Sequence, residues 1–178
     1  MISIFNILLI VFLILLIPTA YAGLIGAPYA PTFTPAFRRA FDYIKLSKKD
    51  TVVDLGSGDG KVVLEAAKRG AKGIGYELSP IFWAISWVRG LGVKNASFKM
   101  LNFYKKSLPL ETTVIFAFLM PEHMDEVKDY LAKQNLPNGK YFMAYSFPLP
   151  KEVVPIHVVH EPKTGRVFIY DLKQLTKP

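Results

Sequence analysis

Residues 52–61 read VVDLGSGDGK, from Val52 to Lys61, and this stretch decides the fold. It joins a short β-branched run to a loop with glycine at every second position, followed by the start of a helical pattern. A buried strand that leads through such a loop into a helix lets a ligand approach the backbone closely, with helix N–H groups directed at it. The stretch therefore predicts a ligand-binding turn at the carboxyl end of a strand.

A second acidic residue follows at a spacing that suits a nucleoside. Glu77 ends the next predicted strand, about twenty residues after the loop, where an acid can accept hydrogen bonds from both ribose hydroxyls. A glycine turn that binds no ligand is the structural alternative. The coincidence of strand, loop, helix and second acid favours the ligand-binding interpretation.

The spacing of the glycines separates three classes of ligand. A phosphate-binding P-loop has four residues between its glycines and Ser or Thr after its lysine, whereas Gly56 and Gly60 enclose three and Val62 follows Lys61. The dinucleotide pattern G-x-G-x-x-G requires glycine at the position of Lys61. ATP bound in this way is excluded and NAD is disfavoured, which leaves the pattern D-x-G-x-G-x-G that starts at Asp54.

Strand and helix patterns alternate around this loop. Strands are predicted over residues 51–55, 73–77, 96–100, 113–119, 141–147, 153–160 and 166–172, and helices over 60–69, 79–91 and 121–134, with one more opening at an N-cap Thr34. Alternation that closes in a hairpin predicts an α/β fold. We expect a Rossmann-like, seven-stranded, mostly parallel sheet with a C-terminal antiparallel hairpin.

The first 25 residues differ from the rest, because every charged residue lies at or after Arg38. The apolar run is long enough for a helix that crosses a bilayer. We therefore expect a transmembrane anchor over 1–25, a linker over 26–33 and a catalytic domain over 34–178. The Ala20-Tyr21-Ala22 pattern favours a cleaved signal peptide as the alternative. Basic residues follow the run and none precedes it, which predicts a single-pass protein with its domain on the cytoplasmic side.

Composition limits the function further. A chain of 178 residues suits one domain, and a hydrophobic content of 51% argues against disorder. The absence of Cys excludes a disulfide scaffold, a Cys-ligated zinc site and a cysteine nucleophile. The net charge of +8 comes from scattered basic residues that often neighbour acids, which favours contact with an anionic membrane and makes a nucleic-acid partner less suitable.

The loop pattern resembles that of S-adenosylmethionine-dependent methyltransferases of the seven-stranded class. A narrower resemblance, over about residues 28–172, is to the small membrane-attached mitochondrial lysine methyltransferases that modify the ATP synthase c-subunit and the adenine nucleotide translocase. It rests on Tyr29–Thr32, Asp54–Lys61, Gly75–Pro80, Phe147–Pro150 and Arg166–Asp171. The domain would then lie on the matrix side if the protein is mitochondrial.

The resemblance implies S-adenosyl-L-methionine as cofactor and assigns its binding residues. Asp54 would act beneath the loop on the amino end of the cofactor, Glu77 would hold the ribose, and Asn102 stands where an acid near the adenine is expected. The full expected set is Asp54, Gly56, Ser57, Gly58, Asp59, Gly60, Glu77, Leu78, Asn102 and Phe103.

Three residues are candidates for the catalytic step. Tyr29 and Phe103, with Tyr104 and Phe118, would line an apolar pocket that helps a lysine amine to lose its proton. The alternative for Phe103, Tyr104 and Phe118 is a place in the hydrophobic core. Glu122 is either a carboxylate that faces the acceptor or a charge that stabilises a helix N-terminus. Methyl transfer needs no metal, and none is expected.

The predicted function is that of a membrane-anchored protein-lysine N-methyltransferase that acts on a membrane-protein partner. Two alternatives stay open at this point. One is a methyltransferase of a lipid-phase small molecule, and the other is a non-catalytic assembly factor that binds S-adenosylmethionine.

Overall fold

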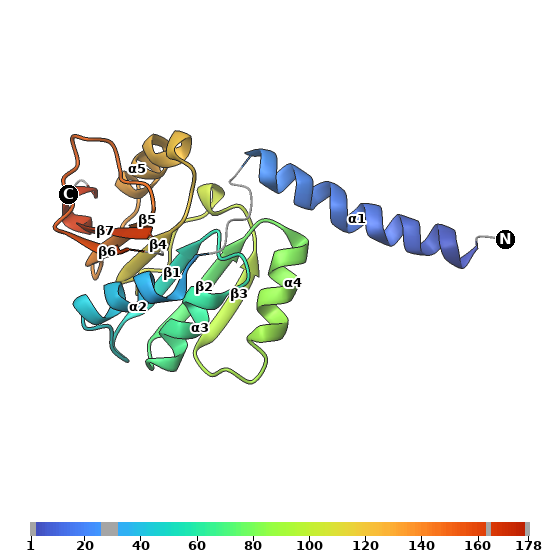
Figure 1. Cartoon of the computed structure of the whole chain (residues 1–178), viewed down its shortest axis with the longest axis horizontal. Helices are drawn as coiled ribbons and strands as arrows, with labels where there is room; N and C mark the ends of the chain where they lie inside the picture. The colour runs from blue at the N-terminus through green and yellow to red at the C-terminus, as the bar shows by residue number, and fades with distance from the viewer. Residues whose placement is uncertain (1–2, 26–31, 163–164, 177–178) are drawn as a thin grey trace.

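A computed structural model of the chain describes residues 3–25, 32–162 and 165–176, and these form an α/β domain around one sheet (Figure 1). The order of the seven strands is β3-β2-β1-β4-β5-β7-β6. Their bounds are β1 (Thr51–Leu55), β2 (Lys72–Glu77), β3 (Ala96–Met100), β4 (Val114–Ala117), β5 (Tyr141–Tyr145), β6 (His157–Glu161) and β7 (Gly165–Asp171). The first five strands are parallel, and β7 runs antiparallel to both β5 and β6. The predicted seven-stranded sheet with its C-terminal antiparallel strands is confirmed.

Helices α2 to α5 cover the two faces of the sheet, and α1 lies outside them (Figure 1). The long ones are α1 (Ile4–Ile25), α2 (Thr34–Tyr43), α3 (Lys61–Lys68), α4 (Pro80–Arg89) and α5 (Met124–Ala132), and the short 3-10 turns are η1 (Phe103–Lys105), η2 (Pro121–His123) and η3 (Leu172–Gln174). The helix expected over residues 121–134 is divided, because the segment that starts at Pro121 forms η2 before α5 begins. Thr34 is not the N-cap of α2: Phe33 is, and its side chain makes no capping hydrogen bond.

Two apolar clusters fill the space between the helices and the sheet. On one face Phe37 and Phe41 of α2 pack with Phe116 of β4, with ring centroids about 6 Å apart. On the other face Leu131 of α5 packs over Phe142 of β5. Strands β1 and β4 are buried along their whole length, as expected for central strands of a parallel sheet.

The strand order creates a topological switch point at one edge of the sheet, where sheets of this kind open a crevice for ligands. From β1 the chain moves outward through β2 to β3, and then returns to place β4 on the other side of β1. Ligands bind at such a switch point, outside the carboxyl ends of the strands. The loop after β1 and the segment after β4 both lie at this edge.

Helix α1 projects from the domain (Figure 1). Large apolar residues are exposed from Ile4 to Ile17, and the hydroxyl Oγ1 of Thr19 lies 3.1 Å from Oγ of Ser79. Within the described ranges, no helix has the combined length and hydropathy needed to cross a lipid bilayer. The predicted transmembrane helix is therefore not supported. The division into anchor, linker and domain stays a prediction, and residues 26–31 of the linker lie outside the described ranges.

Candidate active site

The loop after β1 has a backbone conformation that requires glycine. Gly56, Gly58 and Gly60 have φ angles of 85°, 51° and 80°, in the left-handed region that other residues rarely adopt. The N–H groups of Gly56 and Ser57 both donate to the carbonyl oxygen of Tyr76 at 2.9 Å. These bonds fix the loop against the carboxyl end of β2, with the start of α3 directly after it.

Close packing beneath the loop also requires residues without side chains. A Cβ atom at Gly60 would lie 2.7 Å from the ring of Phe98, and one at Gly75 would lie 2.6 Å from Oγ of Ser57. Because these distances are below van der Waals contact, a larger residue at either position would displace the loop or β3. The loop is thus held at a fixed height above the sheet.

Glu77 lies against the glycine loop, as the spacing predicted. Its Oε2 accepts a hydrogen bond from the N–H of Gly58 at 2.7 Å, and its Oε1 accepts one from the N–H of Ser79 at 2.8 Å. The side chain is 9% exposed. Two backbone donors therefore orient the carboxylate at the carboxyl edge of the sheet. Leu78, a predicted cofactor-binding residue, lies in the chain between Glu77 and the second donor, Ser79.

Asp54 is buried beneath the loop with only 3% of its surface exposed. Burial raises its pKa well above the ordinary value, and the negative charges of Glu77 and Asp59 raise it further. No hydrogen bond or ion pair joins its carboxylate to a residue that the structure describes, and Oγ of Ser57, in the loop that follows, is buried without a partner. Two unmatched polar groups at one loop fit a polar, positively charged ligand group, such as the amino end of S-adenosylmethionine.

Asp59 faces basic side chains. Nη1 of Arg89 donates to its Oδ2 at 2.6 Å and to its carbonyl oxygen at 2.7 Å, and Nζ of Lys61 lies 3.5 Å from Oδ2. This carboxylate therefore joins the loop to the end of α4. Asp59 was predicted to bind the cofactor, whereas Arg89 was not predicted at this site, because the two residues are far apart in the chain.

Asn102 and Phe103 directly follow the carboxyl end of β3, and Phe103 belongs to the apolar core. Oδ1 of Asn102 accepts a hydrogen bond from the N–H of Tyr104 at 3.0 Å, which caps η1. Phe103 is buried, with its ring centroid 4.1 Å from that of Tyr104 and 5.5 Å from that of Tyr130. The N–H of Leu101 donates to the carbonyl oxygen of Glu77 at 3.0 Å, so this segment is bonded to the strand end that carries the acid.

Three aromatic rings meet at the carboxyl ends of β4 and β5. The ring centroid of Phe118 lies 4.7 Å from that of Tyr145, in an edge-on arrangement, and 6.4 Å from that of Phe147. Between the last two, Ser146 has a φ of 65° and the N–H of Phe147 donates to the carbonyl oxygen of Tyr145 at 2.8 Å. This is a strained γ-turn, of the kind found at functional sites. We call these three rings the aromatic corner; only Phe118 was a candidate from the sequence.

The segment before α2 is fastened across the site at two points. Nζ of Lys61 donates to the carbonyl oxygen of Thr32 at 3.3 Å, and the N–H of Phe33 donates to the hydroxyl of Tyr145 at 3.3 Å. Burial raises the pKa of Tyr145. The segment therefore links the glycine loop to the aromatic corner. Tyr29 lies outside the described residues, so its predicted role stays a prediction.

Glu122 is exposed within η2, just after β4. It occupies the first turn of this short helical segment, where a negative charge is favourable. Its predicted catalytic role stays a prediction.

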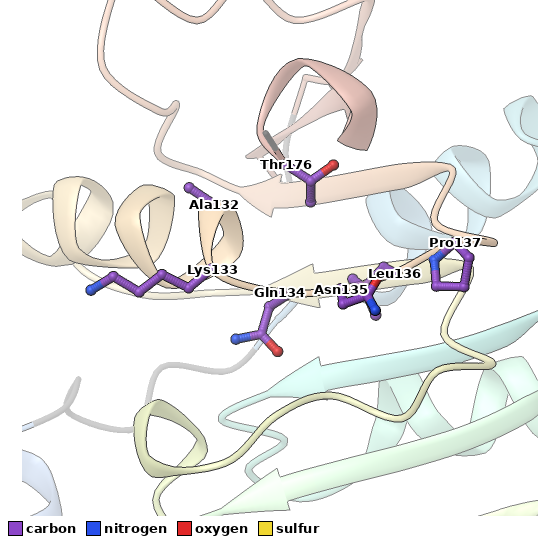
Figure 2. A pocket seen from close by; sticks show the side chains of 7 residues that line it. All are labelled: Ala132, Lys133, Gln134, Asn135, Leu136, Pro137 and Thr176. Carbon is purple, nitrogen blue, oxygen red and sulfur yellow. The ribbon is translucent and has the colours of Figure 1, made fainter. Parts of the chain in front are cut away.

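A separate cavity of about 360 Å³ lies away from these groups (Figure 2). It is bounded by the end of α5, the loop that follows it and the C-terminal segment, and is lined by Ala132, Lys133, Gln134, Asn135, Leu136, Pro137 and Thr176. Because this loop leads into the start of β5, the cavity lies at the amino edge of the parallel strands. It is therefore on the opposite edge of the sheet from the glycine loop.

Known proteins with similar sequences indicate the family of this chain. The profile of the ANTKMT methyltransferase domain matches residues 54–155. The chain is 31% identical to the ATP synthase c-subunit lysine N-methyltransferase of Xenopus laevis, over 84% of this chain and 66% of that protein. It is 33% identical to a protein-lysine N-methyltransferase of Saccharolobus islandicus (strain REY15A), over 72% of this chain and 84% of that protein. The chain thus spans about two thirds of the length of the frog relative.

A solved structure shares the fold. An RNA methyltransferase from Salinibacter ruber, in complex with S-adenosyl-L-homocysteine, superimposes with a TM-score of 0.73 at 23% identity, over 84% of this chain and 95% of that one. At this level of identity the likeness concerns the fold alone.

Proposed function

Because this chain belongs to the family of the ANTKMT methyltransferase domain, with S-adenosylmethionine as its cofactor, we propose that it methylates a lysine side chain of another protein. The observation that carries the proposal is the pairing of Glu77 with the glycine loop above buried Asp54. This arrangement offers an acid for a ribose and an acid for an amino group on two strands that flank one loop. When bound, S-adenosylmethionine supplies an electrophilic methyl group on a sulfonium.

The chain's own residues contribute position and a water-poor surrounding. In methyl transfer, a C–N bond forms as the C–S bond breaks, and the sulfur keeps the electron pair. The amine attacks only after the lysine ammonium group, whose ordinary pKa is about 10.4, has lost a proton. The aromatic corner, with Phe118, Tyr145 and Phe147, is an apolar surface at the end of β4 and β5, which disfavours the charged ammonium form of a lysine placed against it.

The segment with Thr32 and Phe33 suits a role in holding the acceptor. It is bonded to the glycine loop through Lys61 and to the aromatic corner through Tyr145. Because an in-line displacement depends on close alignment of the two reactants, a segment that fixes both sides of the crevice favours the reaction. By this proposal, the predicted catalytic residues Tyr29 and Phe103 line the same crevice.

The acceptor in this proposal is a membrane protein, and α1 brings the enzyme to it. Exposed apolar side chains cover α1 from Ile4 to Ile17, with Phe5 70% exposed, and no charged residue interrupts them. Exposure of this much apolar surface to water is unfavourable by roughly 25 cal/mol per Å². Contact with the apolar part of a membrane removes that cost. The relatives named for the ATP synthase c-subunit and the adenine nucleotide translocase support a protein acceptor of this kind.

The test uses the full chain, methyl-labelled S-adenosylmethionine and membranes that lack the endogenous enzyme. We expect label on a membrane protein, with the methyl group mapped to a lysine by mass spectrometry. The Asp54→Ala variant serves as the inactive control. Label found only in lipid extracts would instead indicate a small-molecule acceptor. Tight cofactor binding without transfer to any membrane fraction would indicate a non-catalytic role, and either result would overturn the proposal.

A further inference from the structure

One peptide group before α2 is bonded at both of its polar atoms. The peptide between Thr32 and Phe33 carries the carbonyl oxygen that accepts from Nζ of Lys61 at 3.3 Å. The same peptide carries the N–H that donates to the hydroxyl of Tyr145 at 3.3 Å. Because the two bonds together fix its plane, a change at either one alters how the segment before α2 lies. We call this group the clamped peptide.

The ammonium group of Lys61 is shared between the clamped peptide and an acid. Its Nζ lies 3.5 Å from Oδ2 of Asp59, in the glycine loop, and 3.3 Å from the carbonyl oxygen of Thr32. A charge-assisted N–H···O bond at its preferred length measures roughly 2.7–2.9 Å. Neither acceptor therefore holds Nζ at its closest distance, and the charge available on Asp59 decides toward which of the two Lys61 moves.

Arg89, the last residue of α4, binds the same carboxylate oxygen more closely than Lys61 does. Its Nη1 donates to Oδ2 of Asp59 at 2.6 Å and to the carbonyl oxygen of Asp59 at 2.7 Å. The second bond fixes the guanidinium against the backbone of the loop, and this group keeps its positive charge at any ordinary pH. Arg89 thus neutralises Oδ2 and leaves Lys61 at the longer distance from it.

The surroundings of Asp59 make this competition effective. The side chains of Asp59 and Lys61 are only 20% and 24% exposed, so water screens their charges less than it screens those of a fully exposed pair. The other carboxylate oxygen, Oδ1, accepts from the N–H of Lys61 at 3.4 Å, which orients the carboxylate toward the start of α3. Oδ2 is therefore the atom for which Arg89 and Lys61 compete.

We propose that Arg89 is a positioning residue, which occupies Asp59 and thereby keeps Lys61 directed at the clamped peptide. Without Arg89, the charge on Oδ2 of Asp59 would draw Nζ of Lys61 onto itself, and the bond to the carbonyl oxygen of Thr32 would be lost. The inference rests on the proposed function, in which the segment before α2 holds the acceptor. It gives Asp59 a role that is exerted through Lys61 and not by contact with the cofactor.

A purely structural role for Arg89 is the competing explanation. In that case Arg89 only ties α4 to the glycine loop, and its loss loosens the loop whatever charge Asp59 carries. The two explanations differ for a chain that lacks both charges, because Asp59→Asn removes the charge that would draw Lys61 away. Under the proposal, Asp59→Asn therefore rescues Arg89→Met, whereas under the structural explanation the two substitutions add their effects.

Hydrogen exchange at the N–H of Phe33 tests the proposal without any methyl transfer, since this N–H belongs to the clamped peptide. It is measured on the full chain without cofactor, by mass spectrometry with single-residue fragmentation. We expect Arg89→Met to speed exchange about fivefold or more, and the double variant with Asp59→Asn to return it to within about twofold of the wild type. Unchanged exchange in Arg89→Met, or a double variant as fast as Arg89→Met, would overturn the proposal. Asp59→Asn alone keeps Arg89 and should exchange no faster than the wild type; faster exchange would also overturn it.

Transfer kinetics test the consequence for the reaction. Arg89→Met should lower kcat/KM for the protein acceptor about fivefold and change the affinity for S-adenosylhomocysteine less than about threefold. Lys72→Met is the matched control, because it removes one positive charge and a 2.8 Å ion pair with Glu111 at the amino end of β2, and it should change neither value. An equal loss of affinity and of kcat/KM in Arg89→Met would place Arg89 in cofactor binding and overturn the proposal. A wild-type chain that methylates no protein would refute the proposed function, whereas the exchange of Phe33 would still decide the role of Arg89.

Discussion

Glu77 Oε2 accepts a hydrogen bond of 2.7 Å from the N–H of Gly58, so the acid that ends β2 and the middle of the glycine loop are directly bonded. The same carboxylate accepts a second bond from the N–H of Ser79. One side chain therefore both shapes the loop and presents an acceptor to a nucleoside. This dual role leads to the first prediction.

Replacement of Glu77 by Gln should weaken cofactor binding and disturb the loop together. The amide keeps one acceptor atom but presents an NH₂ group to the other backbone donor. Loss of charge-assisted hydrogen bonds of this kind costs about 2 kcal/mol, or about 30-fold in affinity. Calorimetric titration with S-adenosylhomocysteine measures this loss of affinity. Glu111→Gln, at an exposed acid away from the loop, is the matched control, and equal affinity in both variants would contradict the assignment of Glu77.

Replacement of Asp54 by Asn should stabilise the free protein while it weakens cofactor binding. Because burial raises the pKa of Asp54 in the folded chain, its ionised form costs folding free energy. This cost is complete above the folded-state pKa and disappears as the pH falls toward the ordinary value. A gain of ~1 kcal/mol at neutral pH would raise the unfolding midpoint by about 2–4 °C.

Thermal unfolding of the Asp54→Asn variant and the wild type, without cofactor, checks the sign of the stability change and its dependence on pH. The gap between the two midpoints should narrow as the pH is lowered from neutral. Asp129→Asn, at an exposed acid in α5, should show no such trend. A lower midpoint for Asp54→Asn at neutral pH would mean that the carboxylate has a stabilising partner in the free protein.

Replacement of Gly60 by Ala should destabilise the domain more than replacement of Gly92 by Ala. Both glycines have positive φ angles, 80° and 76°, so both variants carry backbone strain of about 1–2 kcal/mol. Only the Cβ at Gly60 meets other atoms, at 2.7 Å from Phe98, whereas nothing lies within 4 Å at Gly92. Overpacking adds about 1–3 kcal/mol to the destabilisation that Gly60→Ala causes. Equal shifts of the unfolding midpoint would refute the packing argument.

Replacement of Lys61 by Met should impair transfer more than cofactor binding. The variant removes the hydrogen bond to the carbonyl oxygen of Thr32, which fastens the segment before α2. We expect kcat/KM for the protein acceptor to fall about 10-fold, with less than a threefold change in affinity for S-adenosylhomocysteine. Lys68→Met, at an exposed position of α3, is the control. A proportional loss in both measurements would place Lys61 in cofactor binding instead.

Replacement of Glu122 by Gln distinguishes its two interpretations. An exposed charge at the start of η2 that only stabilises a helix terminus should leave the turnover rate within about threefold of the wild type and lower stability by less than about 1 kcal/mol. A turnover rate reduced by about two orders of magnitude or more, as expected for the loss of a general acid or base, would make it a catalytic residue. Initial rates with saturating cofactor and acceptor measure the difference.

Much of the fold followed from local sequence patterns. The strand over 51–55 and the strand over 96–100 match β1 and β3 residue for residue, and Ser79 caps α4 as its position before Pro80 suggests. The loop glycines and Glu77 could also be identified, because the fixed spacing of the βαβ unit brings them together. These are contacts within one short unit of the chain.

Contacts between distant segments could not be predicted in the same way. The bonds from Lys61 to Thr32 and from Phe33 to Tyr145 depend on how α2 packs across the sheet, and no local pattern encodes that packing. The aromatic corner needed the γ-turn at Ser146, a residue that gives no glycine signal for a positive φ. The apolar N-terminal run gave a clear helix over Ile4–Ile25, but the predicted membrane crossing is not supported.

The hydrogen bond between Thr19 and Ser79 connects α1 to the residue that also contacts Glu77. Oγ of Ser79 is hydrogen-bonded to Thr19 of α1 and also accepts the bond that caps α4. The N–H of Ser79 donates to Glu77. A force that tilts α1 is therefore transmitted within two bonded contacts to the acid beside the glycine loop. Removal of the N-terminal helix to ease purification would take away the Thr19 side of that connection and leave an altered cofactor cradle.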